Sequence, residues 1–248
     1  MKLVFLGTGT STGIPQIGCK CAVCTSTDSK DNRLRASVLL KIENINILID
    51  CGPDLRRQML DNNVDNLDGI LVTHEHYDHI GGLDDVRPLG ETTVYAESRV
   101  LNTIKRNVHY AFSDNPYPGV PVIHLHEIGV EEFQIQHIVI QPIRVMHAKL
   151  PVLGYRIGNV AYLTDVKTID EQSIVQLKGL DILVLNALRI NEHISHLSLK
   201  EALELAKTIG AKKTYFTHFS HDLGKHEEIQ SLLPKNIYLS YDNLELNV

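Results

Sequence analysis

Short apolar runs alternate with turns rich in Gly, Pro, Asn and Asp along most of the chain. Runs of this length, several of them alternating apolar and polar residues, predict strands. Ser37–Ile42 and Ile45–Ile49 flank Glu43 and Asn44, which predicts a hairpin. The other predicted strands are Lys2–Leu6, Asp68–Thr73, Thr92–Tyr95, Phe133–Gln141, Ile143–His147, Pro151–Ile157, Val160–Asp165, Asp181–Leu188, Lys213–Thr217, Ile237–Tyr241 and Leu244–Val248.

Helical patterns lie between several of these strands. Thr168–Glu171 and Ser198–Glu201 both match the capping box, so we expect a helix to begin at each. Gly210 follows the second of these helices and is the type of residue that ends one. Further helices are predicted after Pro53 through Leu60, over Gly82–Leu89 up to its proline, and over Ser98–Val108.

Length and composition predict one globular domain. The chain has 248 residues, 43% hydrophobic and 22% charged, with no repeat or linker, so we expect a single domain over residues 1–248 with a sizeable core. No apolar run approaches the ~18 residues of a membrane span. The N-terminal run is too short for a signal peptide, which favours a cytoplasmic protein. A net charge of −6 disfavours a broad nucleic-acid-binding face.

The most specific chemical signal lies in Thr73–Gly82, directly after a predicted strand. His74, His76, Asp78 and His79 all lie within one segment of six residues. Imidazole and carboxylate groups are the ligands of hydrolytic zinc, manganese and iron sites. The first two histidines can point the same way from the strand end, while the other two residues reach a second point nearby. The motif therefore predicts two adjacent metal ions; the alternative is a polar, histidine-rich turn without a ligand role.

Three later predicted strands also end on a residue that can bind metal. These residues are His147, Asp165 and His218. Each alone is a weak signal, but their common position at strand ends argues against coincidence.

A cluster of cysteines occupies a polar loop at about 18–35. Cys19, Cys21 and Cys24 can close around one zinc ion, which needs a fourth ligand from elsewhere. The alternative is three incidental reduced cysteines. Cys51 stands alone and is expected to be a small core residue.

The H-x-H-x-D-H run, together with the later strand ends, resembles the metallo-β-lactamase superfamily. The likeness covers almost the whole chain and implies an α/β fold, a four-layer αββα sandwich with a binuclear metal site at one edge. Asp50 would orient a ligand. The implied ligands are His74, His76 and His147 for one metal, Asp78, His79 and His218 for the other, and Asp165 between them.

Within this superfamily the chain is most similar to the phosphoribosyl 1,2-cyclic phosphate phosphodiesterases. The likeness rests on Gly7–Ser11 ahead of the cysteine loop, on His221 three residues after His218, and on His196 before a predicted helix. It implies a structural zinc bound by Cys19, Cys21, Cys24 and His221. It also implies that His196 faces the scissile phosphate, with Asp78 as a second catalytic residue.

The implied activity is that of a metal-dependent phosphodiesterase. A hydroxide bridging two manganese or zinc ions would attack a small, cyclic ribose phosphodiester. His196 would protonate or stabilise the oxygen that leaves. His193 is the competing candidate for that task. The resemblance also suggests a homodimer. The net charge disfavours nucleic acid as a partner, and the lack of a long apolar run disfavours a membrane.

Three alternative functions share parts of this pattern. A ribonuclease Z-like tRNA 3′-end nuclease has the same seven ligands, but the acidic charge and the lack of a long inserted arm disfavour it. An acyl hydrolase, such as a thioesterase or lactonase, uses the same binuclear site on a carbonyl carbon. A metal-binding scaffold without activity is the third. The pattern assigns no role to Asp84, Asp85, Arg87 and His109.

Overall fold

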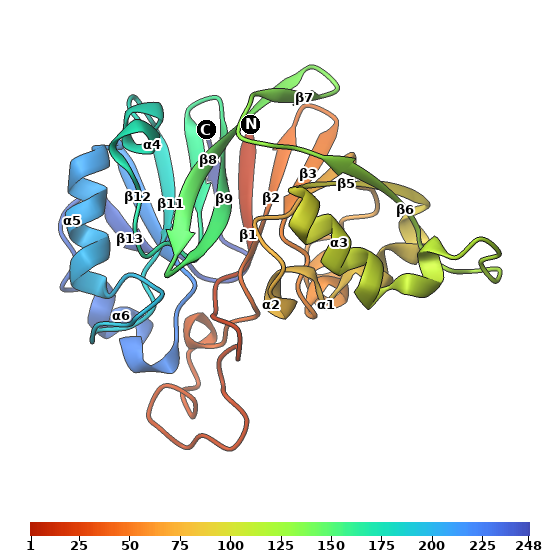
Figure 1. The fold of residues 1–248 in the computed structure, drawn as a ribbon. Coiled ribbons are helices and arrows are strands. Elements are labelled where there is room, and N and C mark those ends of the chain that lie inside the picture. The colour runs from red at the N-terminus through yellow and green to blue at the C-terminus, as the bar shows by residue number, and fades with distance from the viewer.

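The computed structural model describes residues 1–248 and consists of two seven-stranded sheets that pack face to face, with helices on both outer sides (Figure 1). The first sheet contains β1 (Lys2–Gly7), β2 (Ser37–Ile42), β3 (Ile45–Ile49), β4 (Gly69–Leu71), β5 (Glu91–Ala96), β6 (Val122–Glu127) and β14 (Glu245–Asn247). The second contains β7 (Phe133–Ile135), β8 (Ile138–His147), β9 (Leu150–Ile157), β10 (Val160–Leu163), β11 (Ile182–Asn186), β12 (Lys213–Thr217) and β13 (Ile237–Leu239).

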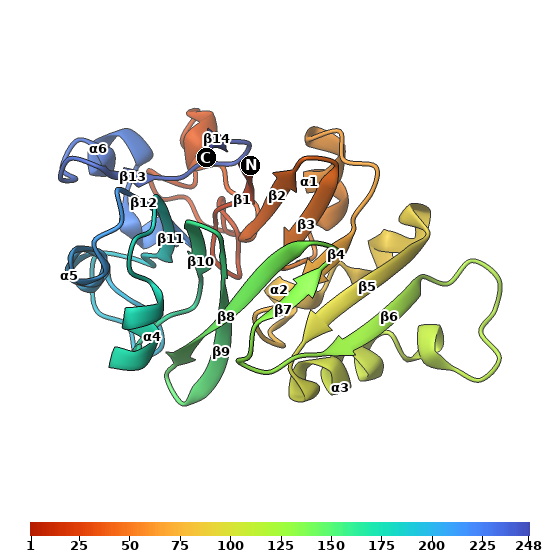
Figure 2. The same cartoon turned by 90° about the horizontal axis from the view of Figure 1, so that it is seen from above.

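The helices are short and lie on the two outer faces. They are α1 (Leu55–Asp61), α2 (Tyr77–Ile80), α3 (Ser98–Asn107), α4 (Glu171–Gln176), α5 (Leu199–Ile209) and α6 (His226–Gln230), with 3₁₀ helices η1 (Ser29–Asp31), η2 (Leu83–Leu89), η3 (His109–Phe112) and η4 (His221–Leu223). Seen from above, α1 to α3 flank the first sheet and α4 to α6 the second (Figure 2). This arrangement confirms the predicted αββα sandwich. No helix combines the length and the apolar character that crossing a bilayer requires.

Each sheet is apolar on both faces, because each face packs against another layer. In β1, Leu3 and Phe5 belong to the core between the sheets, whereas Val4 and Leu6 face the helices of the first sheet. The three apolar clusters are of similar size, at 22, 21 and 19 buried residues, as expected for three interfaces between four layers. Each fully buried Leu or Phe contributes roughly 1.5–3 kcal/mol to this packing.

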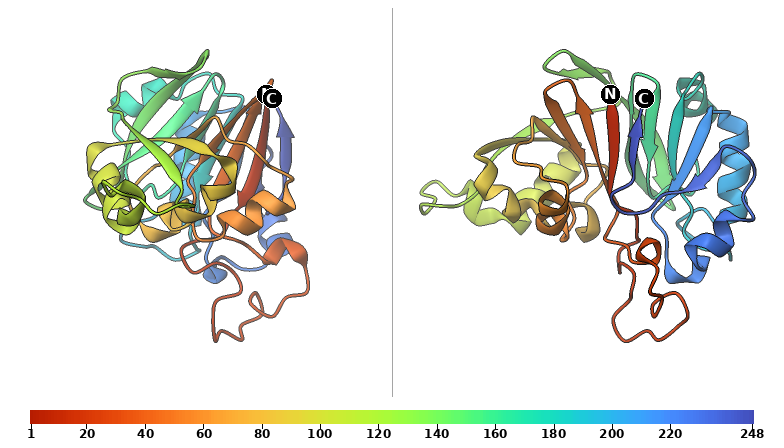
Figure 3. Two further views of the ribbon diagram at one scale, coloured as in Figure 1. Left: turned by 90° about the vertical axis from the view of Figure 1, so that its right-hand side faces the viewer. Right: turned by 180° about the vertical axis from the view of Figure 1, so that it is seen from behind.

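Strand order brings distant parts of the chain together. The sheets run β14-β1-β2-β3-β4-β5-β6 and β13-β12-β11-β10-β9-β8-β7. β1 pairs antiparallel with β14, so the two termini lie side by side (Figure 3). The loop between β1 and β2, which holds the cysteine cluster, projects below both sheets in Figure 1.

Four local predictions were wrong or incomplete. The helix predicted over Gly82–Leu89 is a 3₁₀ helix over Leu83–Leu89, and Pro88 lies inside it instead of stopping it. Thr168 does not cap α4, because its backbone is paired with Met146; the Asp170 carboxylate accepts the bond from the Ser173 N–H instead. A turn at residues 136–137 separates β7 from β8, and β6 was missed.

Candidate metal centre

The predicted ligands come together where strands of both sheets end. His74 follows β4, His147 ends β8, Asp165 follows β10 and His218 follows β12. β10, β11 and β12 are parallel, so their carboxyl ends share one edge of the second sheet.

Two of these residues and Asp50 have an uncommon backbone conformation. φ is 56° at Asp165, 60° at His218 and 63° at Asp50, in the left-handed region that non-glycine residues rarely adopt. Such conformations concentrate at functional sites, where the surrounding structure compensates for the strain.

All seven predicted active-site ligands lie in one cluster. Together with His196, they form three groups whose donor atoms all lie within 4.8 Å of one another: His74, His76 and Asp165; Asp78, His79 and His218; and His147, Asp165 and His196. Asp165 belongs to two groups, which places it between the others. The structure groups His147 with His196 rather than with the first two histidines, although its ring centroid lies 5.3 Å from that of His76 and 5.9 Å from that of His74.

The second group has the dimensions of a cation site. Nε2 of His79 lies 3.2 Å from Asp78 Oδ2 and 3.4 Å from Asp165 Oδ1. Nε2 of His218 lies 3.2 Å from Asp165 Oδ1 and 3.6 Å from Asp78 Oδ2. Ligand atoms around a tetrahedral zinc, with bonds of about 2.1 Å, are about 3.4 Å apart. Both Nε2 atoms are buried without a hydrogen-bond partner, so the donor set fits a divalent cation.

One buried carboxylate orients two of the histidines. Asp50 accepts hydrogen bonds from the Thr73 backbone N–H (2.8 Å), the Thr73 hydroxyl (3.0 Å) and His79 Nδ1 (2.7 Å). Since the Thr73 hydroxyl donates to Asp50, its oxygen is free to accept from His74 Nδ1 at 3.0 Å. Both histidines then carry their proton on Nδ1, which leaves each Nε2 free to bind metal. The structure agrees with the orienting role expected for Asp50.

Burial and neighbouring charge act against each other in the cluster. Burial opposes ionisation of Asp165, but the nearby His218 and His79 outweigh it and hold the pKa of this carboxyl well below its usual value. Burial likewise opposes protonation of His79, whereas Asp78 and Asp50 hold its pKa well above the usual value. Asp78 and Asp165 therefore stay ionised and favour a positive charge at this site, which a bound cation would supply in place of the proton on His79 Nε2.

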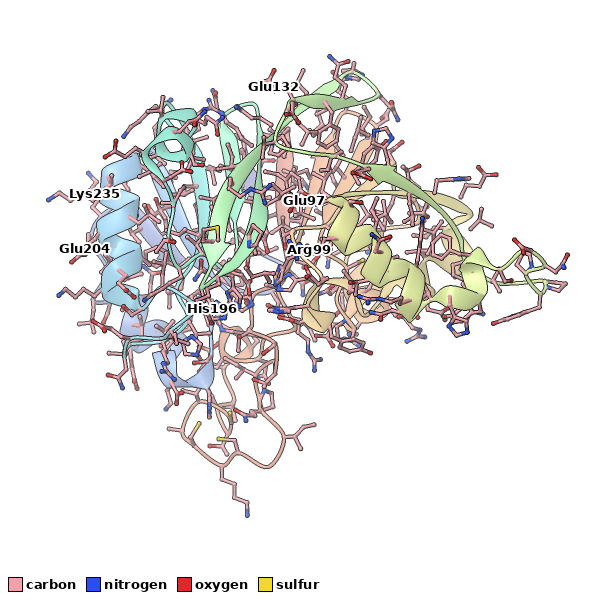
Figure 4. All side chains as sticks on the ribbon, in the orientation of Figure 1. Glu97, Arg99, Glu132, His196, Glu204 and Lys235 are labelled. Carbon is pink, nitrogen blue, oxygen red and sulfur yellow. The ribbon has the colours of Figure 1, made fainter.

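His196 lies beside the cluster, at the lower end of the sheets in Figure 4. Its side chain is buried, its Nδ1 has no hydrogen-bond partner, and this atom lies 3.9 Å from Asp165 Oδ2. Its ring centroid is 4.4 Å from that of His147 and 5.0 Å from that of His218. Burial lowers the pKa of His196 to about 3. His193 lies 5.2 Å from His196 between ring centroids, and its Nδ1 already accepts from the Ser195 N–H.

A small polar pocket opens next to His196. Its volume is about 200 Å³, and Leu188 is the one hydrophobic residue in its lining. The remaining lining residues are Thr10, Ser11, Thr12, Gln16, Arg189, His193, His196, Ser220, His221 and Asp222. The glycine-rich loop after β1 thus forms one wall of this pocket.

The cysteine loop and the segment after β12 meet at a second candidate metal site. Sγ of Cys19, Cys21 and Cys24 lies 3.3, 3.4 and 3.5 Å from Nδ1 of His221. Tetrahedral zinc with one nitrogen and three sulfur ligands requires N–S separations of about 3.6 Å. The Cys24 backbone N–H, followed by His221, lowers the pKa of the Cys21 thiol to about 6, which favours the thiolate that zinc binds. The residues present therefore fit zinc.

Several other residues lie outside the cluster. Asp84 pairs with Arg87 and accepts from the Tyr110 hydroxyl, both at 2.5 Å, and it belongs to none of the metal-type groups. His109 packs edge-on against the Tyr110 ring. Cys51 is fully buried in the core of the first sheet, as expected.

The sequence did not predict the ion pairs of Glu75 with Arg99 and of Glu97 with Arg144, because no local pattern indicates such long-range pairing.

Comparison with known proteins identifies the family. Residues 45–219 match the family model of the beta-lactamase superfamily domain. A solved structure described as a new diphosphatase from the PhnP family is 40% identical to this chain and superimposes with a TM-score of 0.94. The match covers 100% of this chain and 97% of the other. The chain belongs to the PhnP family of the metallo-β-lactamase superfamily. The resemblance noted in the sequence is thereby confirmed.

Two further relatives show how far this likeness extends. A protein of Porphyromonas gingivalis named octanoyltransferase is 44% identical over 251 residues, which are 99% of this chain and 51% of that protein. The chain thus spans about half or less of the length of the curated relatives that it matches. Zn²⁺-bound PqqB of Methylobacterium extorquens, 18% identical with a TM-score of 0.85 over 100% of both chains, shares the fold.

Proposed function

We propose that this PhnP-family protein is a metal-dependent phosphodiesterase for small, polar phosphoric diesters, with cyclic ribose phosphates as the first class to test. The observation that carries the proposal is the pair of ligand groups joined through Asp165, with His196 beside it. The diphosphatase relative supports hydrolysis at phosphorus.

We assign His74, His76 and His147 to one metal ion, and Asp78, His79 and His218 to the other, with Asp165 between them. Two divalent ions bound there, zinc or manganese, would supply an activated water and neutralise phosphoryl oxygens. The chain's own contribution is to hold the imidazoles in the correct tautomer and the carboxylates ionised, through Asp50 and the charge balance around Asp165.

His196 is the residue we assign to the leaving group. A buried imidazole nitrogen without a partner is rare, because a lost hydrogen bond is costly in a buried site. This ring stands between the ligand cluster and the polar pocket, so a substrate that spans both would place a polar atom next to it. Hydrogen bonding of His196 to the leaving oxygen stabilises the charge that develops as the P–O bond breaks.

The pocket favours a polar leaving group. Its volume of about 200 Å³ and its hydroxyl-bearing wall suit a sugar or phosphate. A hydrophobic slot for an eight-carbon acyl chain is missing from its lining, which disfavours an acyl hydrolase. The octanoyl transfer named for the P. gingivalis relative belongs to a protein of which about half lies outside the match.

Metal analysis combined with a substrate panel tests the proposal. We expect the purified protein to hydrolyse bis(p-nitrophenyl) phosphate and ribose cyclic phosphates, with no turnover of p-nitrophenyl octanoate and no salt-sensitive shift of labelled tRNA. His196→Ala should lower kcat by about 100-fold or more and keep the metal content. His193→Ala is the matched control and should have a much smaller effect. Ester hydrolysis without phosphodiester hydrolysis would refute the proposal, and loss of metal in His196→Ala would refute the assignment of that residue.

Homodimer assembly and a single domain over residues 1–248 remain predictions, which light scattering and limited proteolysis can check.

A further inference from the structure

Between His74 and His79, Glu75 is the one acidic or histidine side chain that belongs to none of the candidate metal-binding groups. It forms an ion pair with Nη1 of Arg99, in the first turn of α3. Nη2 of the same guanidinium donates to the backbone carbonyl of Pro151 at 2.6 Å, and it lies 3.5 Å from Glu97 Oε2. Arg99 thus joins the turn between His74 and His76 to β9.

The pairing continues onto the strand that carries His147. Arg144, three residues before His147 in β8, binds both oxygens of Glu97, at 2.6 and 3.0 Å. In the register of the hairpin, Pro151 lies opposite Met146, next to the pair of His147 with Leu150. The four side chains therefore form one neutral chain of charges from the metal motif to β8, in the order Glu75, Arg99, Glu97, Arg144.

This network spans the junction between the two sheets. The His74–His76 segment follows β4 in the first sheet, and His147 ends β8 in the second. Figure 4 labels Glu97 and Arg99 at the end of α3 that faces the β8–β9 hairpin. The side chains of the network are 20–33% exposed, so their ion pairs are less screened by solvent than those of a fully exposed surface pair.

Only an arginine suits the position of Arg99. Its planar fork reaches a carboxylate with one nitrogen and a carbonyl with the other, whereas the single ammonium of lysine offers no such geometry. The contact to the Pro151 carbonyl is directional, because that oxygen belongs to the backbone of the hairpin.

We propose that Arg99 is a positioning residue of the metal centre: it holds the His74–His76 turn against the β8–β9 hairpin, so that His147 stays aligned with these two histidines. The inference rests on the proposed assignment of His74, His76 and His147 to one ion. Arg99 touches none of these three side chains and acts through Glu75 and the hairpin backbone.

The test measures metal affinity by competition with a chromogenic chelator, with Zn²⁺ and Mn²⁺ in turn, on the wild-type protein and on Arg99→Gln, Arg99→Lys and Glu75→Gln. We expect Arg99→Gln and Glu75→Gln to weaken one of the active-site ions by about 10–100-fold and to leave the other unchanged, the range found when groups that orient ligands are removed. The double variant Arg99→Gln/Glu75→Gln should lose no more than Arg99→Gln alone, because the loss of Arg99 already removes its contact with Glu75. Arg99→Lys should fail to restore the affinity.

Lys212→Gln is the matched control. It breaks an ion pair with Asp181 (2.6 Å), which precedes β11 and so lies at the opposite end of the second sheet from the metal cluster. It should leave the affinity of both ions unchanged. With bis(p-nitrophenyl) phosphate, the Arg99 variants should show a lower kcat at limiting metal, with KM within twofold of wild type and recovery at saturating metal.

Suppose that the wild-type protein binds two active-site ions and that Arg99→Gln and Glu75→Gln bind them with the same affinity. This result would overturn the inference and leave the proposed function standing. A wild-type protein that binds no ion at this centre would overturn the proposed function and the inference with it. If Arg99→Gln does not fold, as judged by circular dichroism, Glu75→Gln decides, because it preserves the shape of the side chain.

Discussion

Asp50 Oδ2 lies 2.7 Å from His79 Nδ1, and both side chains are completely buried. The other carboxylate oxygen accepts from the Thr73 backbone N–H at 2.8 Å. Every polar atom around this carboxylate is therefore a donor, which an amide group in the same place could not satisfy on both sides. Asp50 therefore acts only as a hydrogen-bond acceptor. By holding the proton of His79 on Nδ1, it leaves Nε2 of this ring available for metal.

Asp50→Asn should weaken metal binding by about 10–100-fold. The new NH₂ group either faces the Thr73 N–H or faces His79 Nδ1, and the second arrangement moves the imidazole proton to Nε2, where it blocks the metal. Chelator competition measures the change. The control Asp181→Asn changes a carboxylate far from the metal cluster and should bind metal as wild type does. An unchanged affinity in Asp50→Asn would show that the carboxylate does not set the tautomer.

Gly52→Ala should displace the metal motif. A Cβ at this position would lie 2.1 Å from the backbone oxygen of Asp78, so the segment after β3 and the motif could no longer pack together. We expect a loss of about 1–3 kcal/mol in unfolding free energy, as for other overpacked sites, and weaker metal binding. Urea denaturation and metal titration measure both. In the control Gly129→Ala the nearest atom is the mobile end of Glu131, which can move away, so little change is expected.

Cys21→Ser should remove one zinc per chain and leave the active-site ions in place. The serine oxygen is a poor substitute for the thiolate in a site of three sulfur atoms and His221. Elemental analysis gives the stoichiometry, and faster proteolysis within residues 18–35 should accompany the loss, because the zinc would order this loop. Cys51→Ala is the cysteine control. An unchanged zinc content in Cys21→Ser would contradict the assignment.

The stability of the protein should depend on the protonation of His226. Arg33 Nη2 donates to Nδ1 of this buried ring at 3.1 Å, which requires a neutral imidazole. Burial, then the charge of Arg33, lowers the pKa of His226 to about 4. The unfolded chain, with a pKa of about 6.5, binds the proton between pH 4 and 6.5 while the folded chain does not. This group therefore destabilises the fold as the pH falls through that range.

When the pH falls from 7 to 5, the unfolding free energy of the His226→Gln variant should decrease less than that of the wild type. Urea titration of both proteins at both pH values measures this. The nearby Asp242, whose pKa burial raises to about 6, acts in the opposite direction in both proteins, so the difference between them isolates His226. Equal losses in the two proteins would show that His226 titrates normally in the folded state.

Local features of the sequence determined most of the elements and the ligand types. Apolar runs of strand length placed Ser37–Ile42, Ile45–Ile49 and Lys213–Thr217 with the bounds observed, and the Ser198 capping box is formed as predicted. These features depend on neighbours a few residues away, which is the range over which strand alternation and capping act. The His74–His79 spacing is local in the same sense, so the sequence alone indicated a centre with two groups of ligands.

Tertiary structure alone decided which of these residues meet. It grouped His147 with His196, made Thr168 a partner of Met146 instead of a helix cap, and joined Glu75 to Arg99 across 24 residues of sequence. Such contacts arise when segments that are distant in sequence pack together, and sequence periodicity carries no information about which side chains then face each other. The sequence by itself therefore determined which side chains capable of binding a metal this protein carries, and tertiary packing decided which of them meet, because only packing brings the ends of separate strands to one edge.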